Sequence, residues 1–121
     1  MTTTGGATEV KVRDLTIGSR ISLRLGDPAS AASSLGLALP ACIDRRAVTG
    51  GRSALCLGPD EWLIEAAGDA AAALSAALAG LAAQTPLSAV DISDREIARC
   101  LDGPAVPDLL ATGCPLDLAR M

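Results

Sequence analysis

The sequence predicts an α+β fold, a ferredoxin-like split βαβ sandwich in which an antiparallel sheet carries helices on one face. Segments of strand and helix periodicity follow one another in the order strand, helix, strand, strand, helix, strand, with one more helix after them. Half of the 121 residues are apolar, yet Trp62 is the only aromatic residue, so the core must be built from small and aliphatic side chains. We expect a disordered tail over residues 1–8 and a single domain over residues 9–121.

The first strand and helix follow from alternation and capping. Residues 20–25 alternate polar and apolar side chains, which predicts a strand with one solvated face. Asp27 is suited to cap the helix that follows, and Pro28 suits its first position. The helix should therefore cover residues 28–35 and end at Gly36, which can adopt a left-handed conformation.

A loop and a hairpin come next. Residues 40–52 contain proline, two adjacent glycines and three arginines, and we expect an exposed, flexible loop there. Strands are predicted over Ser53–Leu57 and Trp62–Ala66, joined by a turn at residues 58–61. Trp62 is expected to be the central core residue of this hairpin and not an exposed stacking platform.

The second half of the chain begins with an alanine-rich helix. It should run from a cap at Asp69 to Ala83, and its leucines form one stripe. These leucines are Leu74, Leu78 and Leu81. Residues 87–92 and 95–101 are predicted to be extended, and the intervening Ser-Asp-Arg bend fits a bulge, a kink or a change of strand. A last helix should begin near Pro104 and stop at Gly113.

The composition excludes several kinds of chemistry. There is no histidine, which removes Ser-His-Asp and Cys-His pairs and histidine-ligated zinc. The four cysteines form no C-x-x-C pair, so a four-thiolate metal site is disfavoured and each is expected to be a small buried hydrophobe. They are Cys42, Cys56, Cys100 and Cys114. With no signal peptide or membrane span predicted, we expect a cytoplasmic protein.

Charged residues give no strong catalytic signal. Asp91, Asp94 and Glu96 form the densest carboxylate cluster, but the interleaved Arg95 and Arg99 favour an ion-paired edge over acid-base or metal chemistry. Lys11 lies near the expected tail with no apolar pocket around it in the sequence, so Schiff-base chemistry has no support. The net charge is −4, divided as +3 over residues 1–52 and −7 over residues 53–121, which argues against nucleic-acid binding and hints at a charged interface.

Several sequence strings resemble the gamma subunit of heterotetrameric sarcosine oxidase. They are Leu-Gly-Pro-Asp-Glu-Trp-Leu at 57–63, Val-Asp-Ile-Ser-Asp-Arg at 90–95, Leu-Asp-Gly-Pro-Ala at 101–105 and Gly-Cys-Pro-Leu-Asp-Leu at 113–118. The resemblance covers residues 35–118. Its motif residues are Gly58, Pro59, Asp60, Glu61, Trp62, Asp91, Ser93, Asp94, Arg95, Gly103, Pro104, Gly113, Cys114, Pro115, Leu116 and Asp117.

The resemblance implies a role in assembly. Sarcosine oxidase demethylates sarcosine to glycine, forms hydrogen peroxide and passes the one-carbon unit to tetrahydrofolate. Its FAD, FMN, NAD, zinc and folate sites are expected in other subunits, so no catalytic, cofactor or metal residue is assigned to this chain. The implied partners are the flavin-bearing alpha and beta subunits and the small delta subunit, and no nucleic acid or membrane.

One alternative function stays open. The more distant resemblance is to the folate-binding aminomethyltransferase superfamily, which includes the glycine-cleavage T-protein. It implies a fold of that type and allows a stand-alone folate-binding or aminomethyltransferase domain, with Asp91 or Asp94 the only carboxylate suited to engage the pterin. The resemblance to the gamma subunit also implies that this chain corresponds to the first part of that subunit, because members of the gamma-subunit family continue beyond the Leu-Asp-Leu segment.

Overall fold

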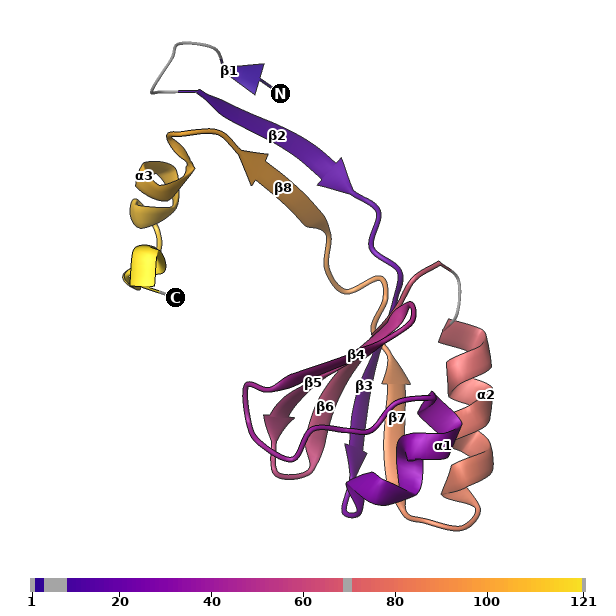
Figure 1. Ribbon diagram of the computed structural model, residues 1–121. Helices are drawn as coiled ribbons and strands as arrows, with labels where there is room; N and C mark the ends of the chain where they lie inside the picture. The colour runs from indigo at the N-terminus through magenta and orange to yellow at the C-terminus, as the bar shows by residue number, and fades with distance from the viewer. Residues whose placement is uncertain (1, 4–8, 69–70, 121) are drawn as a thin grey trace. The chain divides into compact units, whose positions relative to one another are not determined.

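The computed structural model describes residues 2–3, 9–68 and 71–120 of the chain. These residues form two compact units (Figure 1). Unit 1 combines Met1–Thr16 with Ile97–Met121, and unit 2 is Ile17–Glu96. The expectation of one domain over residues 9–121 stays a prediction. Within the expected tail 1–8, Thr2–Thr3 form a short strand, β1, and the other residues lie outside the described part of the chain.

Unit 2 is a five-stranded antiparallel sheet with helices on one face, which confirms the predicted α+β class. The strands lie in the order β4-β5-β6-β3-β7, so β3 is flanked by β6 and β7. Without β4, this is the strand order of a split βαβ unit. The bounds are β3, Ser19–Leu25; β4, Arg46–Thr49; β5, Arg52–Gly58; β6, Glu61–Ala66; and β7, Leu87–Asp91.

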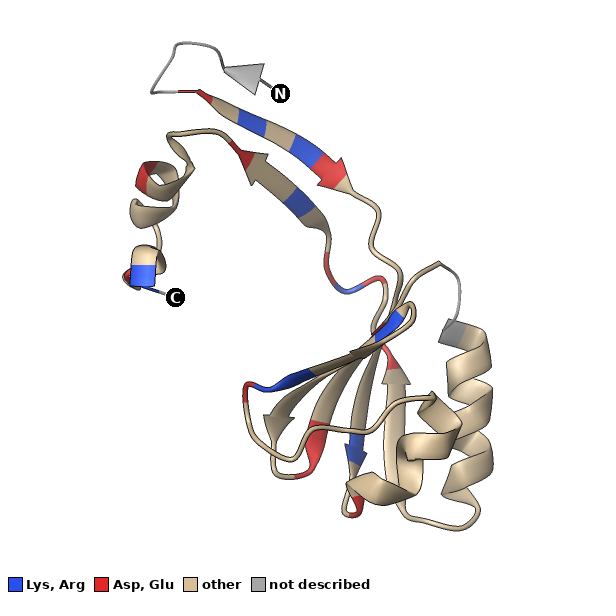
Figure 2. Ribbon diagram, in the orientation of Figure 1, with Lys and Arg blue, Asp and Glu red and all other residues tan. Residues whose placement is uncertain are grey.

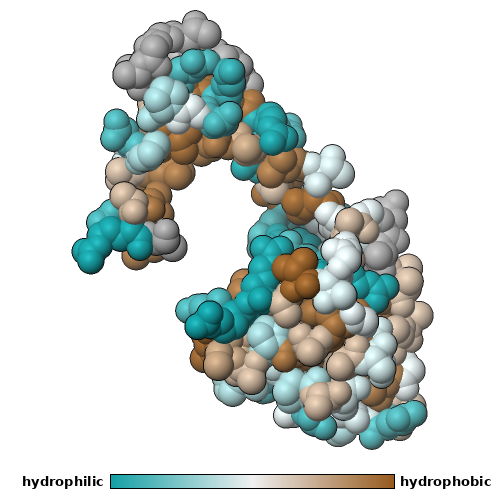
Figure 3. Space-filling model, viewed as in Figure 1, coloured by the Kyte–Doolittle hydropathy of each residue, from teal (hydrophilic) through white to brown (hydrophobic). Residues whose placement is uncertain are grey.

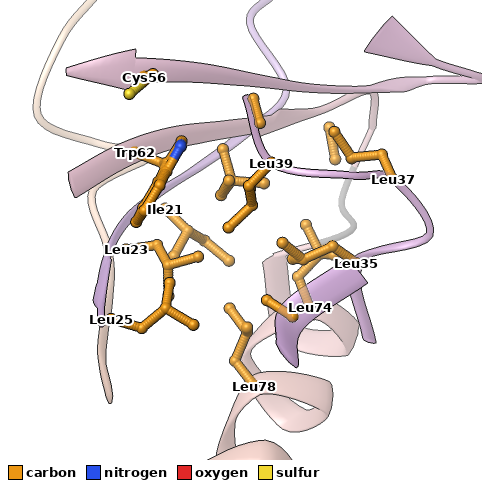
Figure 4. Close-up of a cluster of buried hydrophobic side chains, with 14 residues drawn as sticks. Ile21, Leu23, Leu25, Leu35, Leu37, Leu39, Cys56, Trp62, Leu74 and Leu78 are labelled. Carbon is orange, nitrogen blue, oxygen red and sulfur yellow. The ribbon is translucent and has the colours of Figure 1, made fainter. Parts of the chain in front are cut away.

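The core lies between the sheet and the helices (Figure 4). Alternate residues of β3 face it, and Leu23 stands opposite Trp62 in β6 and Ala89 in β7. Trp62 is 1% exposed, and its indole Nε1 donates to the carbonyl of Pro40 at 2.8 Å. The prediction that Trp62 is a core residue is therefore confirmed.

A short helical segment covers part of this core and begins as the sequence predicted. It consists of a 3-10 turn at Pro28–Ala31 followed by α1, Ala32–Leu35. The Asp27 side chain accepts from the backbone N–H of Ala29 at 3.1 Å. Gly36 ends the helix with a φ of 70°, a conformation that costs glycine little.

The alanine-rich helix α2, Ala71–Ala82, covers the rest of the sheet face. Leu74 and Leu78 are buried, and Leu81 is partly buried and packs against the same cluster. The predicted stripe is therefore confirmed. Each fully buried leucine contributes about 1.5–3 kcal/mol relative to an exposed one. The predicted cap at Asp69 lies outside the described residues.

The expected flexible loop over residues 40–52 is wrong in its second half. Residues 46–49 form β4, which pairs with β5 through the Gly50-Gly51 turn. Two of the arginines are also held in place, because Arg46 donates to the Ser53 hydroxyl at 3.0 Å and Arg52 donates to the carbonyl of Leu35 at 2.7 Å. An edge strand is held by backbone hydrogen bonds and needs no alternating apolar pattern, so the sequence of β4 does not show that it is a strand.

Unit 1 contains a second antiparallel sheet of order β1-β2-β8. Its elements are β2, Val10–Leu15; β8, Ala98–Asp102; α3, Val106–Ala111; and a 3-10 turn at Leu118–Arg120. The strand predicted from residue 95 begins only at Ala98, and α3 is capped by Thr112 before the predicted stop at Gly113. Within unit 1, none of residues 9–16 and 97–120 is buried.

Replacing Trp62 with Ala should lower the free energy of unfolding by about 3–5 kcal/mol, because it leaves a cavity in the core and an unpaired carbonyl at Pro40. Urea unfolding followed by far-ultraviolet circular dichroism measures this loss. The control is Val48→Ala, at a side chain that is 65% exposed, which should change stability by less than about 0.5 kcal/mol. Equal effects of the two substitutions would contradict the core assignment.

Candidate functional site

The Ser-Asp-Arg bend after β7 closes back onto the neighbouring strand β3. Ser93 donates from its backbone N–H and its hydroxyl to Oδ1 of Asp91, at 2.9 Å and 2.5 Å. The same hydroxyl oxygen accepts from the backbone N–H of Arg20 at 3.0 Å, and the N–H of Ile92 donates to the carbonyl of Arg20 at 2.9 Å. The bend is thus a change of strand, since the chain leaves the five-stranded sheet here and enters the other sheet at β8.

Asp91 is held as a carboxylate by this turn. The Ser93 hydroxyl is the main cause of a lowered Asp91 pKa, the Ser93 backbone N–H adds to it, and slight desolvation opposes it. Hydrogen bonds to the charged form favour that form. Asp91 is therefore suited to fix the turn and poorly suited to act as a general acid.

The outer face of the sheet in unit 2, opposite the helices, is crossed by ion pairs (Figure 2). Arg20 Nη1 lies 2.7 Å from Oε2 of Glu96, and Arg20 Nε lies 3.9 Å from Oε2 of Glu65. Arg46 also approaches Glu65, at 3.8 Å. Basic residues of the first half of the chain thus meet acidic residues of the second half within one unit.

Glu96 forms an ion pair, as expected, but with a different arginine from the neighbouring ones that the sequence suggested. Glu96 pairs with Arg20, and Arg99 pairs with Asp14 of β2 at 3.0 Å in unit 1. Asp91, Asp94 and Glu96 do not share one strand, because β7 ends at Asp91 and the bend follows it. No local sequence pattern marks Arg20 as the residue that joins this cluster, because Ser93 and Glu96 lie more than 70 residues from it.

A pocket of about 380 Å³ lies at the bend, near the first turn of α2. Its walls carry two carboxylates and two hydroxyls, of which the Ser19 hydroxyl donates to the carbonyl of Gly68 at 3.1 Å. The lining residues are Ile17, Gly18, Ser19, Ala72, Asp91, Ser93 and Asp94. The pocket is small, open and rich in hydrogen-bond acceptors, so it suits a polar ligand that donates hydrogen bonds.

The motif residues 58–62 form the β5–β6 turn and its base. The carbonyl of Asp60 accepts from the N–H of Leu25 at 3.1 Å, which ties the turn to the end of β3. Asp60 and Glu61 lie 3.8 Å and 3.7 Å from the Arg24 guanidinium. Pro59 is exposed and Gly58 is buried. All of these contacts hold the hairpin in place.

The motif residues of unit 1 also occupy turns. Gly103 has a φ of 133°, and a Cβ there would lie 2.3 Å from the carbonyl oxygen of Glu9, so a larger residue would not fit. Pro104 follows it directly. The N–H groups of Gly113 and Cys114 donate to the carbonyl of Leu110, at 3.1 Å and 2.9 Å, and close the end of α3.

The remaining motif residues are mostly exposed. Asp117 accepts from the N–H of Ala119 at 3.2 Å, which starts the last 3-10 turn. Pro115, Leu116, Asp94 and Arg95 are exposed. The motif residues are therefore distributed over separate turns in both units and do not converge within either one.

The cysteines differ in their surroundings. Cys56 is buried and its thiol donates to the carbonyl of Gly58 at 3.1 Å, as expected of a small core residue. The same expectation is wrong for Cys42, which is exposed, and for Cys100 and Cys114, which are partly exposed. The Nζ atom of Lys11 lies 3.6 Å from Oε1 of Glu9. Among the described residues no three potential metal ligands cluster.

These features place the chain in the class of α+β proteins built on a split βαβ antiparallel sheet. It is 32% identical to sarcosine oxidase subunit gamma of Corynebacterium sp. (strain U-96) in an alignment 118 residues long, which covers 93% of this chain and 57% of that subunit. It also resembles the structure of heterotetrameric sarcosine oxidase from Corynebacterium sp. U-96 in complex with pyrrole 2-carboxylate. That match has a TM-score of 0.76 and 32% identity, and it covers 94% of this chain and 60% of the other.

The chain is thus similar, over nearly its whole length, to the gamma subunit of heterotetrameric sarcosine oxidase, and it spans somewhat over half the length of that subunit. The resemblance found in the motif strings is confirmed. No protein-family profile matches the chain. Among the described residues, no helix is both long and apolar enough to cross a membrane.

Replacing Asp91 with Asn should make the stability of unit 2 less dependent on pH. Because its pKa is lowered in the folded state, the ionised carboxylate stabilises the fold above the unfolded pKa, near 3.8, and this stabilisation disappears as the pH falls through the folded value. Urea midpoints from Trp62 fluorescence at about pH 7 and pH 3 measure the effect. Asp94→Asn should behave like the wild type at both pH values, and a wild-type-like Asp91→Asn would contradict the role of the turn.

Proposed function

We propose that the chain acts as a non-catalytic gamma subunit of a sarcosine oxidase complex and docks onto the flavin-bearing subunits. The observation that carries this proposal is the 32% identity to sarcosine oxidase subunit gamma over nearly the whole chain. The absence of histidine from the sequence and the use of the motif residues in turns support an assembly role over a catalytic one.

In this proposal the chemistry belongs to the other subunits. They would hold FAD, FMN, NAD, zinc and tetrahydrofolate, demethylate sarcosine to glycine and pass the one-carbon unit to the folate. The alpha, beta and delta subunits would be the partners, and the complex would act in the cytoplasm. This chain would bind none of the cofactors itself.

The outer face of the sheet in unit 2 offers a docking surface. An aliphatic row crosses it between the ion pairs, because Leu55 stands opposite Leu63, Leu63 opposite Ser22 and Ser22 opposite Val90. Val90 is 51% exposed. A sheet face with an apolar row and a charged rim has the composition of a protein–protein interface.

Assembly is tested by co-expressing the tagged chain with the alpha, beta and delta subunits encoded in the same genome. The subunits should co-purify with the chain, and the eluate should carry flavin absorbance. Val90→Asp should reduce the recovered flavin about tenfold or more, because it buries a charge in the interface. The matched control, Ser88→Asp on the same strand face, should have a smaller effect. The proposal would be refuted if the chain were monodisperse and none of the three subunits co-purified with it.

The pocket at the bend favours one alternative, a folate-binding or aminomethyltransferase-type domain. Asp91 and Asp94 line it and could accept hydrogen bonds from the amino group of a pterin. Calorimetric titration of the chain with tetrahydrofolate decides between the two functions. We expect no heat of binding at high micromolar ligand, whereas binding that Asp94→Asn weakens would favour the alternative.

A further inference from the structure

The chain passes between the two units twice, at residues 16–17 and again at residues 96–97. Within unit 1, none of residues 9–16 and 97–120 is buried, whereas unit 2 contains a buried core. Leu15, Ile97 and Leu116 are exposed, and Figure 3 shows brown, apolar surface on unit 1. Segments with few buried apolar contacts open at a low cost in free energy. Unit 1 should therefore open locally more often than unit 2, and its openings reach both ends of unit 2.

Residues 92–96, which follow β7, cross over Arg20 near the start of β3, and we call them the strap. The N–H of Ile92 donates to the carbonyl of Arg20 at 2.9 Å, and the N–H of Arg20 donates to the Ser93 hydroxyl at 3.0 Å. The Arg20 guanidinium also donates from Nη1 to Oε2 of Glu96, the last residue of unit 2, at 2.7 Å. The strap thus fastens the end of unit 2 to its beginning through the backbone and the side chain of one residue.

Arg24 lies on the same strand and the same face as Arg20 but is held more loosely. Its side chain is 59% exposed, against 17% for Arg20, and the carboxylates of Asp60 and Glu61 lie 3.8 Å and 3.7 Å from its Nη2. Exposed ion pairs contribute little to stability, because water and salt screen them. The pairing of Arg20 with Glu96, at hydrogen-bond distance and on a mostly buried side chain, is the stronger of the two.

The strap comes between β7 and β8 in the chain. β7 is the edge strand of its sheet and is held there by β3. Hydrogen-bonded pairs alternate along antiparallel strands, so the bond from Ile92 to Arg20 is followed by the pair Val90–Ser22. An opening that travels along the chain from β8 therefore reaches the strap before it reaches the pairing of β7 with β3.

We propose that the strap is a conformational stop, which keeps β7 paired with β3 when unit 1 opens. Val90 belongs to the aliphatic row on the outer face of unit 2, so this surface stays formed whatever the state of unit 1. The inference concerns the chain by itself and does not depend on the assembly role proposed above.

The test is amide hydrogen exchange of the 121-residue chain, followed residue by residue by nuclear magnetic resonance. In the wild type, the amides of β2 and β8 should exchange at least about tenfold faster than those of Ser22 and Val90. Arg20→Gln should speed exchange at Ser22 and Val90 about tenfold, because the strap is released, and should leave the amides between β5 and β6 at the wild-type rate. The matched control, Arg24→Gln, should change exchange at Ser22 and Val90 less than about twofold.

A second variant keeps the test decisive if Trp62 fluorescence shows that Arg20→Gln does not fold. Glu96→Gln leaves the backbone bonds of Arg20 in place and should speed exchange at Ser22 and Val90 about threefold. Three results would overturn the proposal. They are unchanged exchange at Ser22 and Val90 in the folded strap variant, equal effects of Arg20→Gln and Arg24→Gln, and wild-type amides of β2 and β8 that exchange as slowly as those of β3 and β7.

Discussion

The packing of two helices against one face of a single sheet is the constraint on which unit 2 depends. The chain has a single aromatic residue, so the aliphatic side chains on the helix-facing side of the sheet must supply most of the core. Strand β3 sets that direction, because it pairs on both edges and a shift by one residue would turn its apolar side chains away from the helices. Trp62 then fills the space that the alanines and leucines leave.

Elements with a strong local pattern could be predicted from the sequence. The alternation of β3, the β5–β6 hairpin and the leucine stripe of α2 all correspond to observed elements. Strand β4 could not be predicted, because its backbone pairs with β5 while its side chains are mostly exposed. Likewise, local sequence left three possibilities for the bend after β7, since Arg20, which joins it, is distant in the chain.

The candidate site was predictable in its residues but not in their roles. Asp91 belongs to the carboxylate cluster that the sequence offers for acid-base or metal chemistry, and the structure uses it, together with Ser93, to turn the chain. Gly103 and the segment after α3 serve the same kind of purpose in unit 1. A resemblance built on turn residues identifies a fold reliably because turns fix topology, and it says little about catalysis because turn residues need no reactivity.

The bonds from Arg20 to Ser93 and Glu96 have a consequence for how unit 2 is built into the chain. They join the start of its first strand to the residues just after its last strand, so the polypeptide enters and leaves unit 2 at one place. Unit 2 is thus a sequence insertion with adjacent ends, a geometry that tolerates domain insertion and circular permutation. Because its two ends are adjacent, unit 2 can be inserted, removed or replaced between β2 and β8 as a whole, and its internal strand order does not depend on its place in the chain.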